Sequence, residues 1–264
     1  MNKRTFQEYE YALGNRSKRL EEVVMDWGSL RGRLYLWRYD LLISLLRARA
    51  DRSLLIADVG SGDGYFCSKL SEQYQVVGVE FASSKVRMAR ERSSNPHYVV
   101  ADVETLPFNS SSLDIAFCIE VIEHVPEPMR LLSEIFRSLK PGGLLILTTP
   151  SLHMKNFGHS IKSPLKSLAS LYNPKVLPDA SGFSAPDQEG RRVLDRAFSI
   201  QQARSLLMKT GFRHVRVSTI LFLPLVAALV GTRILPTEQR LWSRIPIIRQ
   251  TGTTAMAVGR KPDH

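Results

Sequence analysis

The sequence predicts an α/β protein built on a doubly wound, mostly parallel sheet, and three observations carry this prediction. Short apolar runs that are typical of buried strands alternate with segments whose apolar residues have helical spacing. A glycine-rich loop, GSGDG (60–64), follows the first apolar run. Acidic residues stand at the ends of three successive runs, namely Asp58, Glu80 and Asp102. At 264 residues the chain is long enough for one large domain of this class.

Strands and helices are expected to alternate up to Pro150. The predicted strands are Ser53–Val59, Gln75–Glu80, His97–Ala101, Leu113–Ile119 and Leu144–Thr149. The predicted helices are Tyr65–Tyr74, Ala82–Arg92 and Pro128–Leu139, with a turn at Lys140–Gly143. A last helix, Ser199–Thr210, has an N-cap serine and is stopped by Gly211, and it precedes strands at Arg213–Ile220 and Thr253–Gly259. Right-handed crossovers place ligands outside the carboxyl ends of such strands.

The alternation is interrupted in two places. Residues 151–196 are rich in Ser, Pro, Lys and Gly, and residues 222–250 form a second insertion. We therefore expect an N-terminal helical cap at 1–50 and a main domain at 51–264 that carries both insertions. The first insertion contains apolar residues at helical spacing beside lysines, which predicts a short basic amphipathic helix.

Charge and cysteine content restrict the partners and the compartment. The net charge is +11, and residues 151–264 carry 17 basic and 6 acidic side chains, a difference equal to the whole excess. Cys67 and Cys118 have neither metal-ligand nor disulfide spacing, which indicates buried thiols in a reducing compartment. The N-terminal residues lack the apolar region of a secretory signal, and the apolar stretch Ile220–Gly231 is shorter than the roughly 20 residues that span a bilayer. We expect a cytoplasmic protein.

The glycine loop distinguishes between ligands. A dinucleotide fingerprint reads G-x-G-x-x-G, whereas this loop reads G-x-G-x-G with Tyr65 at the third glycine position. Asp58 and Asp63 flank the loop and would repel a pyrophosphate, but they suit a ligand with a positive end, such as S-adenosylmethionine. A nicotinamide-dependent oxidoreductase remains a less favoured alternative.

From about Leu54 to Thr149 the chain resembles class I S-adenosylmethionine-dependent methyltransferases, in the broad group that includes the quinone-biosynthesis O-methyltransferases. The resemblance lies in ordered blocks: DVGSGDG (58–64), VGVE (77–80), ADVETLPF (101–108), DIAFCIEVIEHVPEP (114–128) and LKPGGLLILTTP (139–150), followed by AFSIQQARSLLMKTGF (197–212). It implies a Rossmann-like, seven-stranded sheet with an antiparallel last strand, plus helical cap insertions.

The resemblance also implies a set of cofactor contacts. Asp58, Gly60, Ser61 and Gly62 would line the methionine part of S-adenosylmethionine. Glu80 would accept both ribose hydroxyls, and Asp102 would accept the adenine amine. Val103 would pack or hydrogen-bond against the adenine, and Ile119 would lie near the sulfonium.

The stretch IEVIEHV (119–125) bears on the transfer chemistry and leaves alternatives open. In the quinone O-methyltransferases a similar E-x-x-E-H lies over a divalent cation, so Glu120, Glu123 and His124 are weak candidates for a Mg²⁺ or Mn²⁺ shell. His124, with Glu120, is a candidate catalytic group, and a purely structural role for His124 is the more favoured alternative. His153, His159 and Arg38 are further candidates near the acceptor or the cofactor carboxylate.

The sequence therefore predicts an S-adenosylmethionine-dependent methyltransferase (EC 2.1.1.-) that acts by in-line methyl transfer on a small or lipid-like acceptor, with O-methylation favoured. The alternatives are C- or N-methylation and a non-catalytic S-adenosylmethionine-binding protein. The basic C-terminal part is compatible with a hydrophobic or lipid-linked acceptor and with peripheral contact with an anionic membrane, and the alternative is that its arginines form a solvated face. Nucleic acid is disfavoured because the arginines are not interleaved with aromatic residues.

Overall fold

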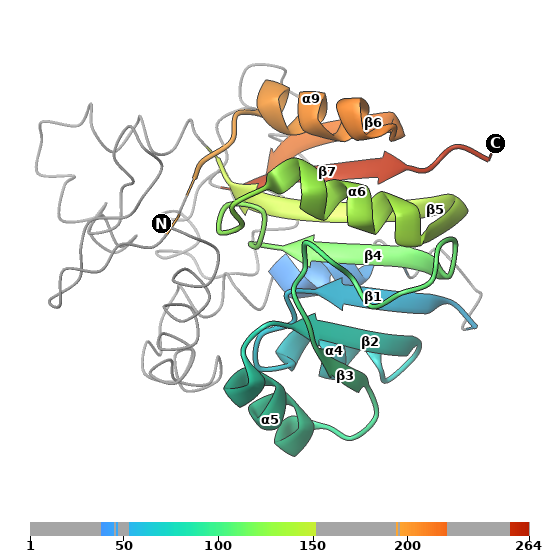
Figure 1. The fold of residues 1–264 in the computed structure, drawn as a ribbon, viewed down its shortest axis with the longest axis vertical. Helices are drawn as coiled ribbons and strands as arrows, with labels where there is room; N and C mark the ends of the chain where they lie inside the picture. The colour runs from blue at the N-terminus through green and yellow to red at the C-terminus, as the bar shows by residue number, and fades with distance from the viewer. Residues whose placement is uncertain are drawn as a thin grey trace, which may run out of the picture.

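Seven strands form one sheet in the computed structural model, in the order β3-β2-β1-β4-β5-β7-β6 (Figure 1). The structure describes residues 38–44, 46, 53–151, 194, 196–220 and 254–263. The strands are β1 (Leu55–Val59), β2 (Gln75–Glu80), β3 (His97–Val100), β4 (Leu113–Ile119), β5 (Leu139–Pro150), β6 (Arg213–Ile220) and β7 (Thr254–Arg260). β7 runs antiparallel to both β5 and β6, while β1 to β5 pair in parallel. The predicted sheet is confirmed.

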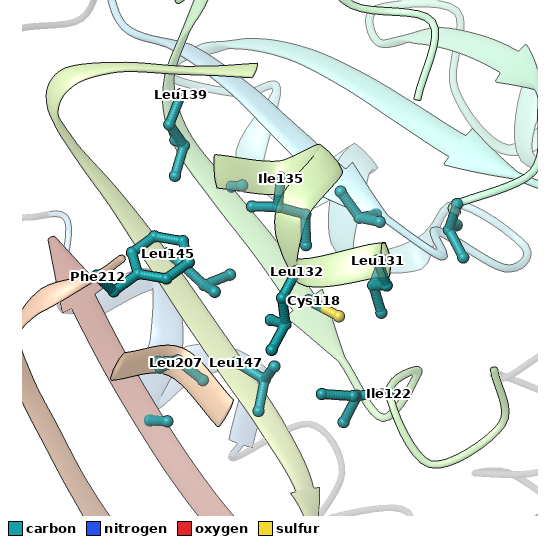
Figure 2. Close-up of a cluster of buried hydrophobic side chains, with 14 of the residues drawn as sticks. Cys118, Ile122, Leu131, Leu132, Ile135, Leu139, Leu145, Leu147, Leu207 and Phe212 are labelled. Atoms are coloured by element: carbon teal, nitrogen blue, oxygen red, sulfur yellow. The ribbon is translucent and has the colours of Figure 1, made fainter. Parts of the chain in front are cut away.

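The helices cover the sheet on two faces. They are α4 (Tyr65–Leu70), α5 (Ser83–Arg92), α6 (Pro128–Ser138) and α9 (Ile200–Thr210), and residues 38–44 are also helical. α6 and α9 pack on one face, where Leu132, Ile135, Leu207 and Phe212 meet β4 and β5 in one apolar cluster (Figure 2). α4 and the N-terminal helical residues contribute Phe66, Leu42 and Leu46 to a second cluster on the other face.

Alternation along the strands decides which face each side chain occupies. In β1, Ala57 and Val59 belong to the cluster under α6 and α9, whereas Ile56 belongs to the cluster under α4. Asp58 shares the face of Ile56, so its carboxylate points toward α4. The same alternation in β5 places Leu145 and Leu147 on one face and Ile146 on the other.

Two sequence predictions about elements are wrong in detail. α4 ends at Leu70, four residues before the predicted Tyr74. The predicted turn Lys140–Gly143 lies within β5, where the pairing jumps from Leu113–Leu139 to Ile115–Leu144. This irregularity is stabilised by Lys140, whose Nζ lies 2.8 Å from Asp114 Oδ1, and by Gly142 at φ 75°.

The predicted cap and insertions lie almost wholly outside the described residues. Residues 1–37, 152–193 and 221–253 are among those not described, so the domain boundaries at 1–50, 151–196 and 222–250 stay predictions. In the described part of the chain, no helix has the length and apolar character needed to cross a membrane. Peripheral membrane contact also stays a prediction.

Candidate active site

The glycine loop after β1 is held against β2 and leaves one glycine open. Gly60 N and Ser61 N both donate to Val79 O, at 2.7 and 3.0 Å. Gly60 has φ 84°, and a Cβ there would lie 2.3 Å from Val121 Cγ2. Gly62 has φ 55°, but a Cβ there would meet no atom of the described residues within 4 Å. The backbone at Gly62 is therefore accessible to a ligand, whereas Gly60 allows the close approach of the loop that follows β4.

Glu80 joins the end of β2 to this loop. Its Oε2 accepts the Gly62 N–H at 3.0 Å, and its Oε1 accepts the Ala82 N–H at 2.9 Å. Two backbone donors, one on each oxygen, fix the orientation of the carboxylate. Because β2 lies between β1 and β3 in the sheet, Glu80 stands between the glycine loop and the end of β3.

Asp58 is a buried acid whose charge is unfavourable without a cation. The residue is 3% exposed, and Cys67 Sγ lies 3.2 Å from Asp58 Oδ2. Burial is the main cause that raises the pKa of Asp58 to about 7; the negative charge of Glu80 adds to it, and the hydrogen bond from Cys67 opposes it. Burial also raises the pKa of the Cys67 thiol, which therefore acts as the donor. A positively charged ligand near Asp58 would favour its ionised form.

Asp63 is placed differently from the sequence expectation. Its Oδ2 lies 2.9 Å from Arg92 Nη2, and Arg92 Nε donates to Asp63 O at 3.1 Å. Both side chains are largely buried, at 8% and 9% exposure for Arg92 and Asp63. The charge of Asp63 is thus neutralised by Arg92 of α5, so of the two acids expected to flank the loop only Asp58 keeps that role.

Asp102, Val103 and Ile119 lie at the same edge of the sheet as Glu80. Asp102 follows β3, and its Oδ1 accepts the Glu104 N–H at 2.9 Å, which forms a tight turn. Ala101 N donates to Glu80 O at 3.0 Å, so this turn is bonded to the end of β2. Val103 and Ile119 are each 9% exposed. The structure therefore brings the predicted cofactor residues together along adjacent strand ends.

Glu120 and Arg38 join the N-terminal helical residues to the end of β4. Glu120 has φ 55°, an uncommon conformation for a residue with a side chain. It is held there by Thr148, which accepts the Glu120 N–H at 3.0 Å and donates its hydroxyl to Glu120 Oε1 at 3.0 Å. Arg38 Nη1 lies 3.2 Å from the same Oε1, and the Arg38 side chain is 5% exposed.

Glu123 and His124 lie in the loop that follows. Glu123 is 1% exposed, and its Oε2 accepts the Thr149 hydroxyl at 3.1 Å. Burial, with a further contribution from the charge of Glu120, raises the pKa of Glu123 to about 8, and His124 opposes the shift. His124 Nδ1 lies 2.8 Å from Leu194 O, and its Nε2 lies 4.0 Å from Glu123 Oε1. The His124 side chain is 40% exposed, so the ring is open to solvent.

The E-x-x-E-H residues do not form a common ligand set. Glu120 is bonded to Thr148 and Glu123 to Thr149, and consecutive residues of a strand point to opposite faces. The two carboxylates therefore lie on opposite sides of β5. Among the described residues, no group of three or more His, Cys, Asp or Glu side chains is placed to hold a metal ion. His153 and His159 lie outside the described part of the chain.

Sequence reasoning missed three residues that hold the loop between β4 and α6. Arg196 donates to Val125 O at 2.7 Å and to Pro126 O at 3.1 Å. Leu194 supplies the carbonyl that meets His124. Glu104 is 2% exposed, and its Oε1 accepts the Glu127 N–H at 2.8 Å. The acidic Glu104 within the ADVETLPF block was a visible signal, but the contacts of residues 194 and 196 have no local sequence pattern.

Comparison with known proteins finds similar chains. Residues 57–147 match the family described as "Methyltransferase domain". The chain is 29% identical over 186 residues to the ubiquinone/menaquinone biosynthesis C-methyltransferase of Yersinia enterocolitica, covering 64% of this chain and 70% of that protein. It is 31% identical over 152 residues to the ubiquinone biosynthesis O-methyltransferase of Coxiella burnetii, covering 53% of this chain and 64% of that protein.

A solved structure shares the fold. It is the S-adenosylmethionine-dependent methyltransferase from Methanosarcina mazei, with a TM-score of 0.58 and 22% identity, covering 83% of this chain and 98% of that one. The nicotinamide-dependent alternative is set aside on these matches. Residues 57–147 therefore belong to the methyltransferase domain family, and the relatives agree with an S-adenosylmethionine-dependent methyltransferase of this fold.

Proposed function

We propose that S-adenosylmethionine binds along the carboxyl ends of β1, β2, β3 and β4 and that the enzyme methylates a hydroxyl of a small, apolar acceptor. The observation that carries the cofactor placement is the Glu80 carboxylate, fixed by Gly62 and Ala82 beside an open glycine backbone. A further observation supports it: the hydroxyl of Ser61 is buried with no hydrogen-bond partner among the described residues. A ligand polar group in the loop would satisfy this hydroxyl.

The chain offers a complementary group for each part of the cofactor. Glu80 presents two oxygens in fixed orientation to the two ribose hydroxyls. Asp102, in the turn bonded to Glu80, accepts the adenine amine, and Val103 packs against the base. Asp58 and the backbone of residues 60–62 face the methionine part, whose ammonium favours the ionised form of Asp58. Arg38, which pairs with Glu120 at the end of β4, is the guanidinium that we assign to the cofactor carboxylate.

His124 is suited to accept the proton of the acceptor hydroxyl. A carbonyl oxygen can only accept a hydrogen bond, so His124 Nδ1, at 2.8 Å from Leu194 O, carries the ring proton. In the neutral ring the lone pair then lies on Nε2. When bound, S-adenosylmethionine supplies a methyl group on a sulfonium, and the sulfur takes the electron pair of the broken carbon–sulfur bond. His124 takes the proton as the oxygen–methyl bond forms, and the loop residues keep acceptor and methyl in line.

O-methylation and C-methylation are distinguished by the product. The Coxiella burnetii relative is named an O-methyltransferase and the Yersinia enterocolitica relative a C-methyltransferase, both of quinone biosynthesis. We favour O-methylation because a base is needed most where the proton is held on a hydroxyl, and the Nδ1–Leu194 O contact supports a base role for Nε2 of His124. A quinol-type ring, free or lipid-linked, is the acceptor class that both relatives support.

The test uses S-adenosylmethionine carrying a ¹³C-methyl group with catechol and with a prenylated catechol as acceptors. A ¹³C methoxy product formed by the wild type, with a rate reduced about 10²–10⁴-fold in His124→Gln, would support the proposal. A ¹³C methyl on ring carbon would favour the C-methyltransferase alternative. S-adenosylmethionine binding without transfer to a wide panel of hydroxyl acceptors would favour the non-catalytic alternative.

A further inference from the structure

Two residues that precede α9, Leu194 and Arg196, bind the loop that carries His124 through four hydrogen bonds. Leu194 O meets His124 Nδ1 at 2.8 Å, and Arg196 N donates to Glu123 O at 3.1 Å. Arg196 Nη1 donates to Val125 O at 2.7 Å, and Nη2 donates to Pro126 O at 3.1 Å. These contacts bind four consecutive residues, 123–126, to a segment about 70 positions later in the chain.

The shape of the Arg196 guanidinium suits it to bind two neighbouring backbone carbonyls. Its planar fork donates to two successive carbonyls at once, which a single ammonium on a flexible stem does not reproduce. Burial lowers the pKa of Arg196, while the charges of Glu127 and Glu104 raise it. The same Glu104 accepts the Glu127 N–H, so the loop is held at its far end as well.

By binding the carbonyls on either side of His124, Arg196 also fixes the position of the His124 imidazole. His124 stands between Glu123 and Val125, whose carbonyls both accept from Arg196. With the backbone fixed on either side, the ring is kept at hydrogen-bond distance from Leu194 O, and Nδ1 keeps its proton. The nitrogen left to act as base is then Nε2. If the loop were no longer bound, His124 would lose the contact with Leu194 O that favours the Nδ1–H tautomer.

We infer that Arg196 is a positioning residue for His124: by binding the carbonyls of Val125 and Pro126, it holds the ring against Leu194 O and so leaves Nε2 as the proton acceptor. This inference rests on the proposed function for the catalytic consequence. The tautomer itself does not depend on it, because it follows from the contact of Nδ1 with Leu194 O. The two are therefore tested separately.

The first test is a ¹⁵N–¹H long-range NMR spectrum of the histidine rings in the full chain, with His124 assigned by its loss in His124→Gln. We expect the Nδ1–H form in the wild type and a mixture of tautomers in Arg196→Ala. Arg137→Ala is the matched control, because Arg137 likewise donates to two loop carbonyls, Phe108 O at 2.8 Å and Leu106 O at 3.2 Å. It should leave the His124 signals unchanged.

Arg196→Lys keeps the charge and serves where the alanine variant does not fold. It should retain the fold but lose the selection of the tautomer in part. An Nε2–H form of His124 in the wild type would overturn the inference. So would wild-type His124 signals in Arg196→Ala or in Arg196→Lys.

The second test separates this inference from the role of His124. With catechol as the probe acceptor, Arg196→Ala should lower kcat about tenfold or more while the KM for catechol and the Kd for S-adenosylmethionine stay near wild type. A normal rate in His124→Gln would refute the base role and leave the tautomer result to decide the inference. A normal rate in Arg196→Ala, with a strong loss in His124→Gln, would contradict the positioning role.

Discussion

Glu80 Oε2 accepts the backbone N–H of Gly62 at 3.0 Å, and this contact makes the acid at the end of β2 and the glycine loop after β1 one structural unit. The acid therefore has a structural role beside the ligand binding that we propose for it. It also sets the position of the loop backbone that the cofactor would contact. Substitutions in the loop and at Glu80 are expected to have related effects, and the glycines allow these effects to be separated.

Gly62→Ala is expected to lower cofactor affinity much more than it lowers stability. A Cβ there meets no atom within 4 Å in the part of the chain that the structure describes, so the cost to folding is that of φ 55°, about 1–2 kcal/mol. The methyl group would instead project into the space proposed for the methionine part. Calorimetric titration with S-adenosylmethionine, together with thermal unfolding, measures both effects.

Gly60→Ala and Gly142→Ala are the controls for that variant. In Gly60→Ala the new Cβ would lie 2.3 Å from Val121 Cγ2, so about 1–3 kcal/mol of overpacking adds to the backbone cost and stability falls further. Gly142→Ala has a similar positive φ of 75° but lies in the irregular part of β5, away from the loop, and should leave affinity unchanged. Wild-type affinity in Gly62→Ala would refute the open-backbone site.

Arg38→Ala is expected to destabilise the protein by about 1.5–3 kcal/mol, because it removes a charged hydrogen-bond partner at a largely buried position. The control is Lys69→Ala, whose partner Glu72 is exposed and whose loss should change stability by less than about 1 kcal/mol. Chemical denaturation of both variants decides the point. Equal stabilities would show that the Arg38–Glu120 pair contributes nothing beyond a surface ion pair.

Glu123→Gln is expected to flatten the pH dependence of stability. The pKa of Glu123 is raised to about 8 in the folded protein, above its unfolded value near 4.5, so the folded state retains a proton that the unfolded state has lost. The contribution of Glu123 is therefore most favourable below about pH 4.5 and is lost progressively as pH rises to about 8. Glutamine keeps an acceptor for Thr149 and carries no charge.

The measurement is the free energy of unfolding of both proteins at pH 5, pH 7 and pH 9. Glu123→Gln should gain stability relative to the wild type as the pH rises. The pKa of Asp58, raised to about 7, makes the free energy of unfolding of both proteins fall as the pH rises. The difference between the two proteins therefore reports Glu123 alone. Parallel curves would mean that Glu123 is ionised in the folded protein throughout this range, in spite of its burial and of the nearby Glu120.

The sequence was most informative where structure is local. The run QVVGVE (75–80) predicted β2 with its true ends, because an apolar run ending in an acid describes a buried strand that reaches the site edge. Ser199 and Gly211 predicted both ends of α9: Ser199 Oγ accepts the Gln202 N–H at 3.1 Å, and Gly211 has φ 112°. These signals work because caps and periodicity involve residues a few positions apart.

The sequence was least informative where contacts are long-range. Asp63 looked available to a ligand, but Arg92, 29 residues later, binds its carboxylate. Glu120 and Glu123 looked like neighbouring metal ligands, but their partners Thr148 and Thr149 are on opposite faces of β5. Arg196 binds the His124 loop although the two are about 70 residues apart in the sequence. No spacing rule within one segment describes such pairs, since they depend on how the sheet brings the segments together.

The central claim is that Glu80 and the glycine loop hold S-adenosylmethionine, and calorimetric titration of the wild type, Glu80→Gln and Glu80→Ala tests it most directly. Glu72→Gln, which removes an exposed charge beyond the end of α4, is the control. We expect the wild type and Glu72→Gln to bind S-adenosylmethionine equally, Glu80→Gln to bind it at least about tenfold more weakly, and Glu80→Ala to show little or no binding. Unchanged affinity in folded Glu80→Ala would contradict the proposed site.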